Sequence, residues 1–528
     1  MKTLKSSVIL VLSFSFLLVF ASAKTATENF VQCLLRRSPP SYPIAPAIFT
    51  PNNHSYSSVL QTYIQNLRFN TSTTPKPFLI LTALHEYHVR IAILCARIDN
   101  LLMKIRSGGH DYEGVSYVSD IVPFFILDMF NLRRISIDIK TETAWVQTGA
   151  TIGEVFYKIA EESKLHGFPA GVCPTMGVGG HLGGGGYGNM MRKHGLTVDQ
   201  IIDAKIIDVN GKLLDRKEMG EDLFWAITGG GGSSFGVVVA YKIRLVRVPE
   251  TVTVFRVRRT LEENELTEIV DEWQRVAHVI DNDLFIRVTF DVVNGTHKGN
   301  KTLRATFLAM FLGDSKTLLS LINNSFPKLG LKKPDCLEMS WIESVLFWTD
   351  ETSVKALLNR TTGRIHLKRK SDYVKTLIPK KGLNKIWKKM IELEKPMMKF
   401  NPYGGRMGEI ASNATPFPHR AGNLWKIQYT TNWNEEGSRQ ADHLIDLTRK
   451  LYKFMTPFVS KNPRTAFLNY RDLDIGVTHN GKKSYYEGRG YGIKYFEGNF
   501  ERLVKIKTKV DPDNFFRNEQ SIPRFPHV

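Results

Sequence analysis

Two glycine-framed loops constrain this chain of 528 residues more than any other feature of its sequence. One reads Arg-Ser-Gly-Gly-His-Asp over residues 106–111, and the other reads Cys-Pro-Thr-Met-Gly-Val-Gly-Gly-His over residues 173–181. Because glycine lacks a Cβ and tolerates positive φ, such backbones can approach a phosphate-bearing ligand closely. Each loop presents one nucleophilic side chain, His110 or Cys173. One such loop alone is typical of an ordinary turn, but the pair indicates a ligand site.

Further short motifs follow along the chain. They lie at residues 112–114 (Tyr-Glu-Gly), 183–188 (Gly-Gly-Gly-Gly-Tyr-Gly), 401–405 (Asn-Pro-Tyr-Gly-Gly), 416–422 (Pro-Phe-Pro-His-Arg-Ala-Gly), 469–472 (Asn-Tyr-Arg-Asp) and 511–520. Several unrelated signatures in a fixed order are far more specific than one glycine-rich run. With these motifs the chain resembles the berberine-bridge-enzyme-like family of plant secreted flavoproteins, over nearly the whole mature chain.

The resemblance implies a FAD cofactor bonded covalently to His110 and Cys173. It also implies that His181 donates a hydrogen bond near the ribityl chain and the N1 side of the flavin. The other expected FAD contacts are Arg106, Ser107, Gly108, Gly109, Asp111, Thr175, Gly179, Gly180, Gly186, Gly236 and Val238. The glycines at residues 179–180 and 183–186 are expected to leave room for the cofactor. Without the family, His110 reads as a loop histidine bonded to a carbonyl, and Cys173 as a small buried hydrophobic residue.

Alcohol oxidation also needs a base, and the resemblance points to Tyr470, with Tyr187, Lys426 and Gln428 around it. Free tyrosine titrates near pH ~10, so a working base needs a lowered pKa. An ammonium from Lys426 and a hydrogen bond from Tyr187 would favour the phenolate, and a shift of ~3 units corresponds to ~4 kcal/mol. The alternative is that Tyr470 only packs in a half-buried strand. Likewise, the alternation of Lys426, Gln428 and Thr430 fits a solvent-exposed strand face.

Two further positions bear on the chemistry. The alkaloid-cyclising relatives use a carboxylate base in the segment where this chain has Lys-Ile-Gln over residues 426–428, which disfavours alkaloid ring closure. After Cys-Pro-Thr, relatives that react readily with oxygen tend to carry valine, whereas this chain has Met176. The longer side chain predicts an obstructed oxygen path, but methionine is flexible, so oxidase and dehydrogenase both stay open.

The N-terminus reads as a secretory signal over residues 1–23. Lys2 and Lys5 precede an apolar core at residues 8–20, and Ala-Ser-Ala at residues 21–23 is a small-residue cleavage site. The apolar run is shorter than the ~20 residues of a membrane span, and the cleavage site disfavours an uncleaved anchor. We therefore expect a mature protein that is secreted to the extracellular space, the plant cell wall, and free of the membrane.

Export predicts glycans and oxidised cysteines. Asn-x-Ser/Thr sites occur at Asn53, Asn70, Asn294, Asn300, Asn323, Asn359 and Asn413. Four cysteines are too few to build a disulfide scaffold in a chain of this length, so the fold must depend on a hydrophobic core. The family resemblance pairs Cys33 with Cys95, which leaves Cys336 as an expected buried free thiol.

The formal net charge is +20, and the mature chain keeps +18 because the signal carries two lysines and no acids. This balance favours acidic partners, and for an exported protein acidic cell-wall polymers are better candidates than nucleic acid. Solvated surface lysines without a specific partner explain the charge equally well. Short clusters such as Lys-Arg-Lys at residues 368–370 and Lys-Lys at residues 380–381 lack interleaved aromatics, so no nucleic-acid module is expected. No metal site is expected either.

The chain length predicts two domains, and the periodicity predicts an α+β or α/β fold for the first of them. The resemblance implies the α+β class for the whole chain, with an α/β substrate domain. Strands are expected at residues 125–127, 143–149, 201–209 and 238–248, with helices at 86–99 and 153–163. Beyond residue 250, strands are expected at 285–293, 304–312 and 424–429, and helices at 261–281, 315–326, 382–393 and 499–510. The resemblance implies a PCMH-type FAD domain of two subdomains at 24–250 and a substrate domain at 251–465, with an antiparallel sheet and covering helices. Residues 466–528 would return to the FAD domain.

The leading interpretation is therefore a secreted FAD-linked oxidoreductase that oxidises a CH–OH group by hydride transfer. A monolignol-type allylic alcohol and the anomeric hydroxyl of an oligosaccharide are held as equal substrate classes. Dioxygen, giving H2O2, or another acceptor would take the electrons. The alternatives are a catalytically silent glycoprotein that binds cell-wall polysaccharide and, less favoured, an alkaloid-type oxidative cyclase.

Overall fold

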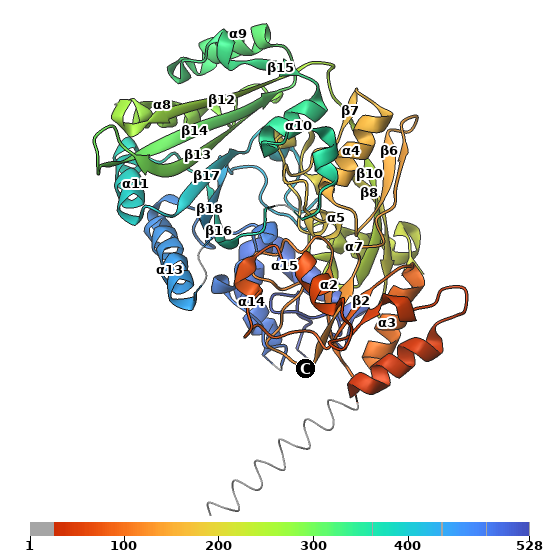
Figure 1. Ribbon diagram of the computed structural model, residues 1–528. Helices are drawn as coiled ribbons and strands as arrows, with labels where there is room; N and C mark the ends of the chain where they lie inside the picture. Colours follow the sequence, from red (N-terminus) through yellow and green to blue (C-terminus); the bar gives the residue numbers. More distant parts are fainter. Residues whose placement is uncertain (1–25, 264, 362, 435–436, 482, 527–528) are drawn as a thin grey trace, which may run out of the picture.

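The computed structural model describes residues 26–263, 265–361, 363–434, 437–481 and 483–526. The expected signal segment, residues 1–23, lies outside the described residues. The described chain contains two sheet-based regions that lie side by side, with the last part of the chain packed against the first (Figure 1). No helix in these ranges is long and apolar enough to cross a membrane.

The first region is built on two main sheets, beside a short two-stranded one. A four-stranded sheet has the order β1-β2-β4-β3, in which β2, β4 and β3 are parallel, and a five-stranded antiparallel sheet has the order β5-β6-β10-β8-β9. Their strands are β1 (Ile48–Phe49), β2 (Leu79–Thr82), β3 (Leu102–Arg106), β4 (Phe124–Asp128), β5 (Ile135–Asp138), β6 (Thr143–Gln147), β8 (Ile201–Ile207), β9 (Leu213–Leu214) and β10 (Val237–Arg244). The runs of β2 and β4 are buried throughout, as expected for parallel strands covered on both faces.

Short helices surround these sheets. They are α2 (Tyr56–Thr62), α3 (Glu86–Ile98), α4 (Ile152–Glu162), α5 (Val178–Gly183), α6 (Met191–His194) and α7 (Arg216–Ile227). The predicted disulfide is confirmed: Cys33, in the helical residues 26–37, is bonded to Cys95 of α3. The first glycine loop begins where β3 ends, and the second leads into α5. Both loops therefore lie at the ends of regular elements that hold them in place.

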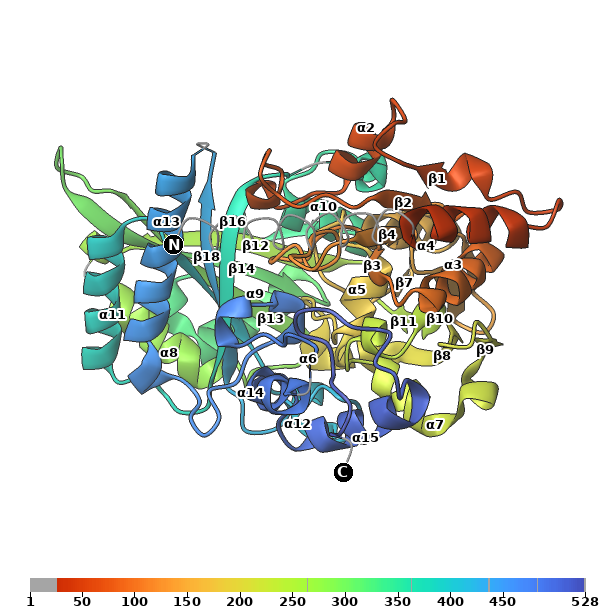
Figure 2. The ribbon, with the colours of Figure 1, turned by 90° about the horizontal axis from the view of Figure 1, so that it is seen from below.

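The second region is a seven-stranded antiparallel sheet with the order β15-β12-β14-β13-β17-β18-β16. Its strands are β12 (Val252–Thr260), β13 (Leu284–Asn294), β14 (Lys301–Phe311), β15 (Leu337–Met339), β16 (His366–Val374), β17 (Met397–Pro402) and β18 (Trp425–Trp433). Its helices are α8 (Leu266–Val276), α9 (Ser315–Ser325), α10 (Trp341–Thr349), α11 (Lys380–Leu393), α12 (Arg406–Glu409) and α13 (Ser438–Phe454). Four of them, α8, α9, α11 and α13, pack on one face of the sheet. The opposite face turns toward the first region (Figure 2).

Strand periodicity sorts the side chains of this sheet. In β18, Trp425, Ile427 and Tyr429 belong to the core under the helices, so Lys426 and Gln428 project from the opposite face. Both are nevertheless buried, because the first region covers that face. The alternative in which this alternation marks a solvent-exposed strand face therefore does not hold.

The end of the chain returns to the first region. Helices α14 (Ser484–Phe496) and α15 (Phe500–Val510) lie beside it, and the Lys507 amine donates a hydrogen bond to the carbonyl of Ser234. Trp341 of α10 packs edge-on against Phe156 of α4 at a centroid distance of 5.3 Å. The hydrophobic core around α4 thus takes side chains from both sides of the predicted boundary at residue 250.

The predicted elements are largely present, with two differences. Helix α8 covers Leu266–Val276 instead of 261–281, because residues 261–263 form a separate 3-10 turn. The strand predicted at residues 238–248 is divided into β10 and β11 (Val246–Arg247), and β11 pairs with β7 (His166–Gly167) instead of continuing in the larger sheet.

Candidate functional site

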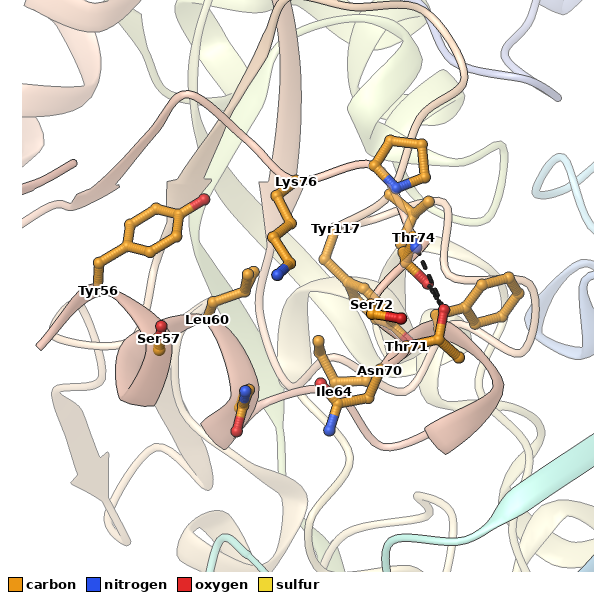
Figure 3. Close-up of a pocket in the computed structure, with 14 residues that line it drawn as sticks. Tyr56, Ser57, Leu60, Ile64, Asn70, Thr71, Ser72, Thr74, Lys76 and Tyr117 are labelled. Atoms are coloured by element: carbon orange, nitrogen blue, oxygen red, sulfur yellow. Dashed lines mark hydrogen bonds between the residues drawn. The ribbon is translucent and has the colours of Figure 1, made fainter. Parts of the chain in front are cut away.

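One large cavity lies between the two regions, and its volume is about 1970 Å³ with the open mouth included. Both glycine loops, the inner face of the seven-stranded sheet and the turn at residues 467–471 line it. A smaller pocket lies apart from it, beside α2, and contains Asn70, Lys76 and Tyr117 (Figure 3). None of the predicted catalytic residues lines that smaller pocket.

The two glycine loops meet backbone to backbone. A Cβ on Gly108 would lie 2.3 Å from the amide nitrogen of Gly177, and a Cβ on Gly177 would lie 2.2 Å from that of Gly108. Neither position can therefore carry a side chain without moving the other loop. Each loop is held by the other, which brings their nucleophilic side chains together.

His110 and Cys173 converge on Thr175. Nε2 of His110 lies 2.8 Å from the Thr175 hydroxyl, and Sγ of Cys173 lies 3.5 Å from the same oxygen. Burial lowers the pKa of His110 to about 4, so its imidazole is neutral at neutral pH and can act as a nucleophile. Both residues line the cavity, whereas Thr175 holds them from behind.

The cavity has the features that FAD requires. Its wall includes backbone at Gly108, Gly109, Gly179 and Gly180. Apart from the chain neighbours and helix backbone of Gly180, no atom of the described residues lies within 4 Å of its Cβ position. Such a wall presents amide groups without side chains to a phosphate-bearing ligand. Ser107, Asp111, Gly236 and Val238 line the same cavity, so most of the expected contacts can reach one ligand.

Three predicted FAD contacts do not line the cavity: Arg106, Thr175 and Gly186. Arg106 is fully buried, where its guanidinium pairs with Asp128 at 2.6 Å. Gly186 has a φ of +68°, and a Cβ there would lie 2.6 Å from the hydroxyl of Thr197. Neighbouring protein atoms surround these residues, and their contact with FAD stays a prediction.

The glycine run at residues 183–186 differs from expectation in the same way. A Cβ on Gly184 would meet the Asn469 side chain at 2.3 Å, and one on Gly185 would meet the ring of Phe417 at 3.1 Å. Close protein packing, more than room for a ligand, therefore requires glycine at residues 184–186.

His181 lines the cavity with a defined tautomer. Its Nε2 accepts a hydrogen bond from the amide of Gly171 at 3.0 Å, so the neutral ring carries its proton on Nδ1. Burial, and to a smaller extent the charge of Lys426, lowers the pKa of His181 to about 3. The ring is therefore neutral at neutral pH. The donation of this proton to FAD stays a prediction.

Met176 lies beside His181 at the cavity wall. A Cβ on Gly171 would come within 2.5 Å of the Met176 methyl carbon and 2.9 Å of Cε1 of His181. The Met176 side chain therefore occupies the space next to Gly171 and His181.

Tyr470 and Tyr187 form a hydrogen-bonded pair, with 2.7 Å between their hydroxyl oxygens. Arg287 of β13 donates to the Tyr187 hydroxyl at 3.1 Å and to Oδ1 of Asn401 at 2.7 Å. Tyr470 lies in a 3-10 turn, Leu468–Tyr470, and not in the half-buried strand considered as its alternative setting. The turn presents its hydroxyl to the cavity together with Gln428.

Lys426 is enclosed by aromatic rings. Its Nζ lies 3.3 Å from the ring centroid of Tyr187, 3.8 Å from that of Phe467 and 4.3 Å from that of Tyr470. It has no hydrogen-bond acceptor among the described residues. Burial, and then the charge of Arg287, lowers its pKa well below 10.5. The aromatic faces oppose this effect, because they favour the charged ammonium.

The protein groups around Tyr470 do not lower its pKa. The prediction that Lys426 and Tyr187 would do so is wrong for these groups. Burial raises the pKa of Tyr470 well above 10, and Tyr187 and Tyr112 add to this, against a smaller opposing effect of Arg287. A phenol enclosed by other phenols has few groups that can solvate its anion.

Several cavity residues were not predicted as site residues: Tyr112, Arg287, Arg369 and Lys399. Asn401, which accepts a hydrogen bond from Arg287, was not predicted either. Tyr112 accepts a hydrogen bond from Gln428 at 3.0 Å. Lys399 and Asn401 share a sheet face with Gln428 and Lys426, their cross-strand partners. Strand alternation could have placed these lysine and asparagine side chains together, but only if the pairing of β17 with β18 had been known.

The basic cluster at residues 368–370 is buried, so these three cations are not part of a basic surface. Lys368 pairs with Glu113 and, at 2.9 Å, with Asp472. Lys370 pairs with Asp472 at 2.5 Å and with Asp474 at 2.9 Å. These five residues, here called the interdomain charge cluster, connect β16 to the segment after the first glycine loop and to the segment after Tyr470.

The remaining predicted positions lie outside the cavity. All seven predicted glycosylation asparagines are exposed, as a glycan requires. Cys336 is a free thiol as predicted, but it is only partly buried and lies at the start of β15, so its description as buried is wrong.

Comparison with known proteins identifies the class. The family model described as "FAD binding domain" matches residues 77–216, and the one described as "Berberine and berberine like" matches residues 466–523. The fold and the site therefore define a FAD-dependent oxidoreductase. Berberine bridge enzyme-like 8 of Arabidopsis thaliana is 62% identical over 530 residues, which cover 99% of this chain and 100% of that protein. This chain belongs to the berberine-bridge-enzyme-like family.

Solved structures agree. The structure of BBE-like 28 from Arabidopsis thaliana has a TM-score of 0.88 at 43% identity and covers 94% of this chain and 100% of its own. Phl p 4, described as a grass pollen allergen with glucose dehydrogenase activity, has a TM-score of 0.87 at 41% identity with the same coverage. An isoleucine-to-valine variant of Phl p 4 is described as a glucose oxidase.

Proposed function

We propose that this chain is a secreted enzyme that oxidises an alcohol with FAD bonded to both His110 and Cys173. The observation that carries the proposal is that both expected attachment residues and the tyrosine pair line one cavity. When bound, FAD would supply the two-electron acceptor for the hydride that leaves the carbinol carbon. The substrate would be a monolignol-type allylic alcohol or a sugar with a free anomeric hydroxyl, and the product an aldehyde, ketone or lactone.

Tyr470 would take the proton of the substrate hydroxyl. In the neutral pair, Tyr470 donates to Tyr187, which also accepts from Arg287. Once Tyr470 is ionised, Tyr187 can donate toward it while Arg287 continues to donate to Tyr187. Burial disfavours an isolated phenolate and an isolated ammonium, but Lys426 and Tyr470 lie close enough for each charge to compensate the other.

The first prediction concerns the covalent attachment of the flavin. We expect peptide mapping of the secreted protein by mass spectrometry to find flavin on the peptides of His110 and Cys173. His110→Ala and Cys173→Ala should each keep the yellow colour in an acid-precipitated pellet, since one bond remains in each variant. The double variant should release it to the supernatant. Unmodified His110 and Cys173 peptides in the wild type would refute the linkage.

The second prediction concerns Met176 and the reaction with dioxygen. Since its side chain occupies the wall beside His181, we expect Met176→Val to open a path for dioxygen and raise the yield of H2O2 per alcohol oxidised several-fold. The Phl p 4 variant supports this, because one isoleucine-to-valine change accompanies oxidase activity in the same fold. Peroxide assays with a fixed alcohol measure it, with Met219→Val as a control outside the cavity. An unchanged yield would show that Met176 does not limit oxygen access.

Localisation in the cell wall is part of the proposal. The Cys33–Cys95 disulfide and the seven exposed glycosylation sites suit an oxidising, secretory route. Acidic wall polymers would be partners of the basic surface, and dioxygen or another acceptor would complete the cycle.

A catalytically silent wall-binding glycoprotein is the second candidate, favoured only by the net charge of +20. Anaerobic screening of monolignols, cellodextrins and oligogalacturonides, followed by flavin absorbance, separates the two. Bleaching of the flavin by at least one of these compounds supports the enzyme. If none of them bleaches the flavin, the silent protein is supported.

A further inference from the structure

We propose that the smaller pocket beside α2 holds the first N-acetylglucosamine residues of a glycan on Asn70. The inference rests on the secretory route in the proposed function, because an exported chain receives such glycans. It goes beyond that function, since it assigns a carbohydrate seat to a pocket that lies apart from the FAD cavity.

Asn70 is both a glycosylation asparagine and a wall residue of this pocket. It begins the sequence Asn-Thr-Ser over residues 70–72, which has a hydroxyl residue two positions after the asparagine, as N-glycosylation requires. Asn70 is exposed, so its amide can carry a sugar. All three residues of this motif line the pocket, and none of the other six glycosylation asparagines does. A sugar bonded to Asn70 therefore starts at the pocket wall.

The pocket has the size and the lining that suit a sugar. Its volume is about 740 Å³ with the open mouth included, within the ~300–1,000 Å³ range of small-ligand sites. Leu60, Ile64 and Tyr117 are buried and form a largely apolar floor. Ser57 and Lys76 are exposed and stand at the rim (Figure 3). A sugar ring has an apolar C–H face and polar edges, so it matches an apolar floor with a polar rim.

Polar groups of the pocket have hydrogen-bonding capacity left for a ligand. Lys76 makes no hydrogen bond or ion pair within the described residues. The Tyr117 hydroxyl is buried and makes no well-formed hydrogen bond among them, although the backbone of Asn66 lies near it. A sugar hydroxyl in the pocket would offer such groups a partner. The lining residues include no carboxylate, so the pocket suits a neutral polar ligand, and the core of an N-glycan is one.

The turn after Asn70 is already closed by hydrogen bonds. The Thr71 hydroxyl accepts a hydrogen bond from the Thr74 amide at 3.2 Å and lies 2.8 Å from the Thr74 hydroxyl (Figure 3). A preformed wall loses little conformational entropy when a ligand settles on it. The base of the glycan would therefore rest against an ordered rim.

One segment separates this pocket from the FAD cavity. Val115 and Ser116 line the cavity, whereas the next two residues, Tyr117 and Val118, line the pocket. The amides of Tyr117 and Val118 both donate to the Gly114 carbonyl, at 2.9 and 2.8 Å, so the segment turns tightly here. A seated glycan would cover the outer side of a wall whose inner side faces the cavity.

Site-resolved peptide mapping of protein secreted from a yeast that adds high-mannose glycans tests whether Asn70 is modified. We expect a glycan on Asn70 in the wild type and in Ser72→Thr, which keeps the motif, but none in Ser72→Ala, which breaks it. A bare Asn70 beside occupied sites elsewhere would overturn the inference and leave the secretory route intact. Bare asparagines at all seven sites would refute both. Alcohol oxidation is measured separately, by flavin reduction.

Digestion of the native protein with endoglycosidase H tests whether the glycan is seated. This enzyme cuts between the first two N-acetylglucosamines, so it needs them outside the pocket. We expect the Asn70 glycan to be cut about tenfold or more slowly than the glycans at the other occupied sites, and at a similar rate once the protein is unfolded. Tenfold corresponds to ~1.4 kcal/mol, about the net contribution of one hydrogen bond. Equal rates at all sites of the native protein would contradict the proposal.

A matched pair of variants assigns the protection to the pocket. Ser57→Trp should fill the pocket mouth and bring the cutting rate at Asn70 up to that of the other sites. Ser58→Trp is the control on the same helix, because Ser58 is exposed and does not line the pocket, and it should keep the slow rate. Slow cutting retained in Ser57→Trp would show that the pocket does not hold the glycan.

Hydrogen exchange gives a readout that does not depend on the glycosidase. Amides of residues 112–118 should exchange several-fold faster in Ser72→Ala and Ser57→Trp than in Ser72→Thr and Ser58→Trp, because the outer side of this segment would lose its cover. Equal exchange in all four variants would overturn the contact between the glycan and this segment.

Discussion

Replacing Tyr470 by phenylalanine is expected to slow flavin reduction by an alcohol by about 10²–10⁴-fold, the usual contribution of a general base. The variant loses only the hydroxyl that would take the substrate proton, and it keeps the ring that packs near Phe467 and Lys426. Stopped-flow absorbance under anaerobic conditions measures the rate directly. The covalent flavin content should stay at the wild-type level, since His110 and Cys173 are unchanged in this variant.

Tyr486→Phe is the matched control, because the Tyr486 side chain is 68% exposed and does not line the cavity. It should reduce its flavin at the wild-type rate. A Tyr470→Phe protein that did the same would remove Tyr470 as the base and leave Tyr187 as the next candidate, given its contact with Arg287.

The second large effect is expected on stability, and it concerns the interdomain charge cluster. Asp472→Asn should lower the free energy of unfolding by about 3–5 kcal/mol, because Lys368 and Lys370 would remain buried without this carboxylate. Urea unfolding followed by fluorescence measures the change. Because Asp472 lies two residues after Tyr470, the variant should also lose part of its alcohol oxidation.

Asp222→Asn is the comparison, since Asp222 pairs with Arg502 at 2.8 Å on the surface. Its expected cost is about 0–1 kcal/mol. Similar losses in both variants would show that burial gives the Asp472 contacts no special weight.

Acid should weaken the same cluster. Burial raises the pKa of Asp474, but a hydrogen bond from Arg449 and the charges of Lys368 and Lys370 outweigh it and hold the pKa well below 3.8. A carboxylate with a depressed folded-state pKa contributes stability that is fully present above its ordinary value and is lost as the pH falls below it.

The local pattern predicted much of the fold. The runs predicted at residues 125–127 and 201–209 correspond to β4 and β8, and those at 86–99 and 382–393 to α3 and α11, because apolar spacing and turn residues act over short distances. The proposed attachment residues were identified from short motifs through the family resemblance, and the structure brings His110 and Cys173 to the same threonine hydroxyl.

The sequence by itself determined where the glycine loops and the candidate tyrosine lie, since those properties belong to a few adjacent residues. Only the tertiary structure decided which distant side chains share the cavity: Arg287, Lys399 and Arg369 come from three strands whose pairing depends on the whole sheet. It also decided that Lys426 and the cluster at residues 368–370 are buried. Burial depends on what covers a strand face, and here the cover comes from segments hundreds of residues away in the chain.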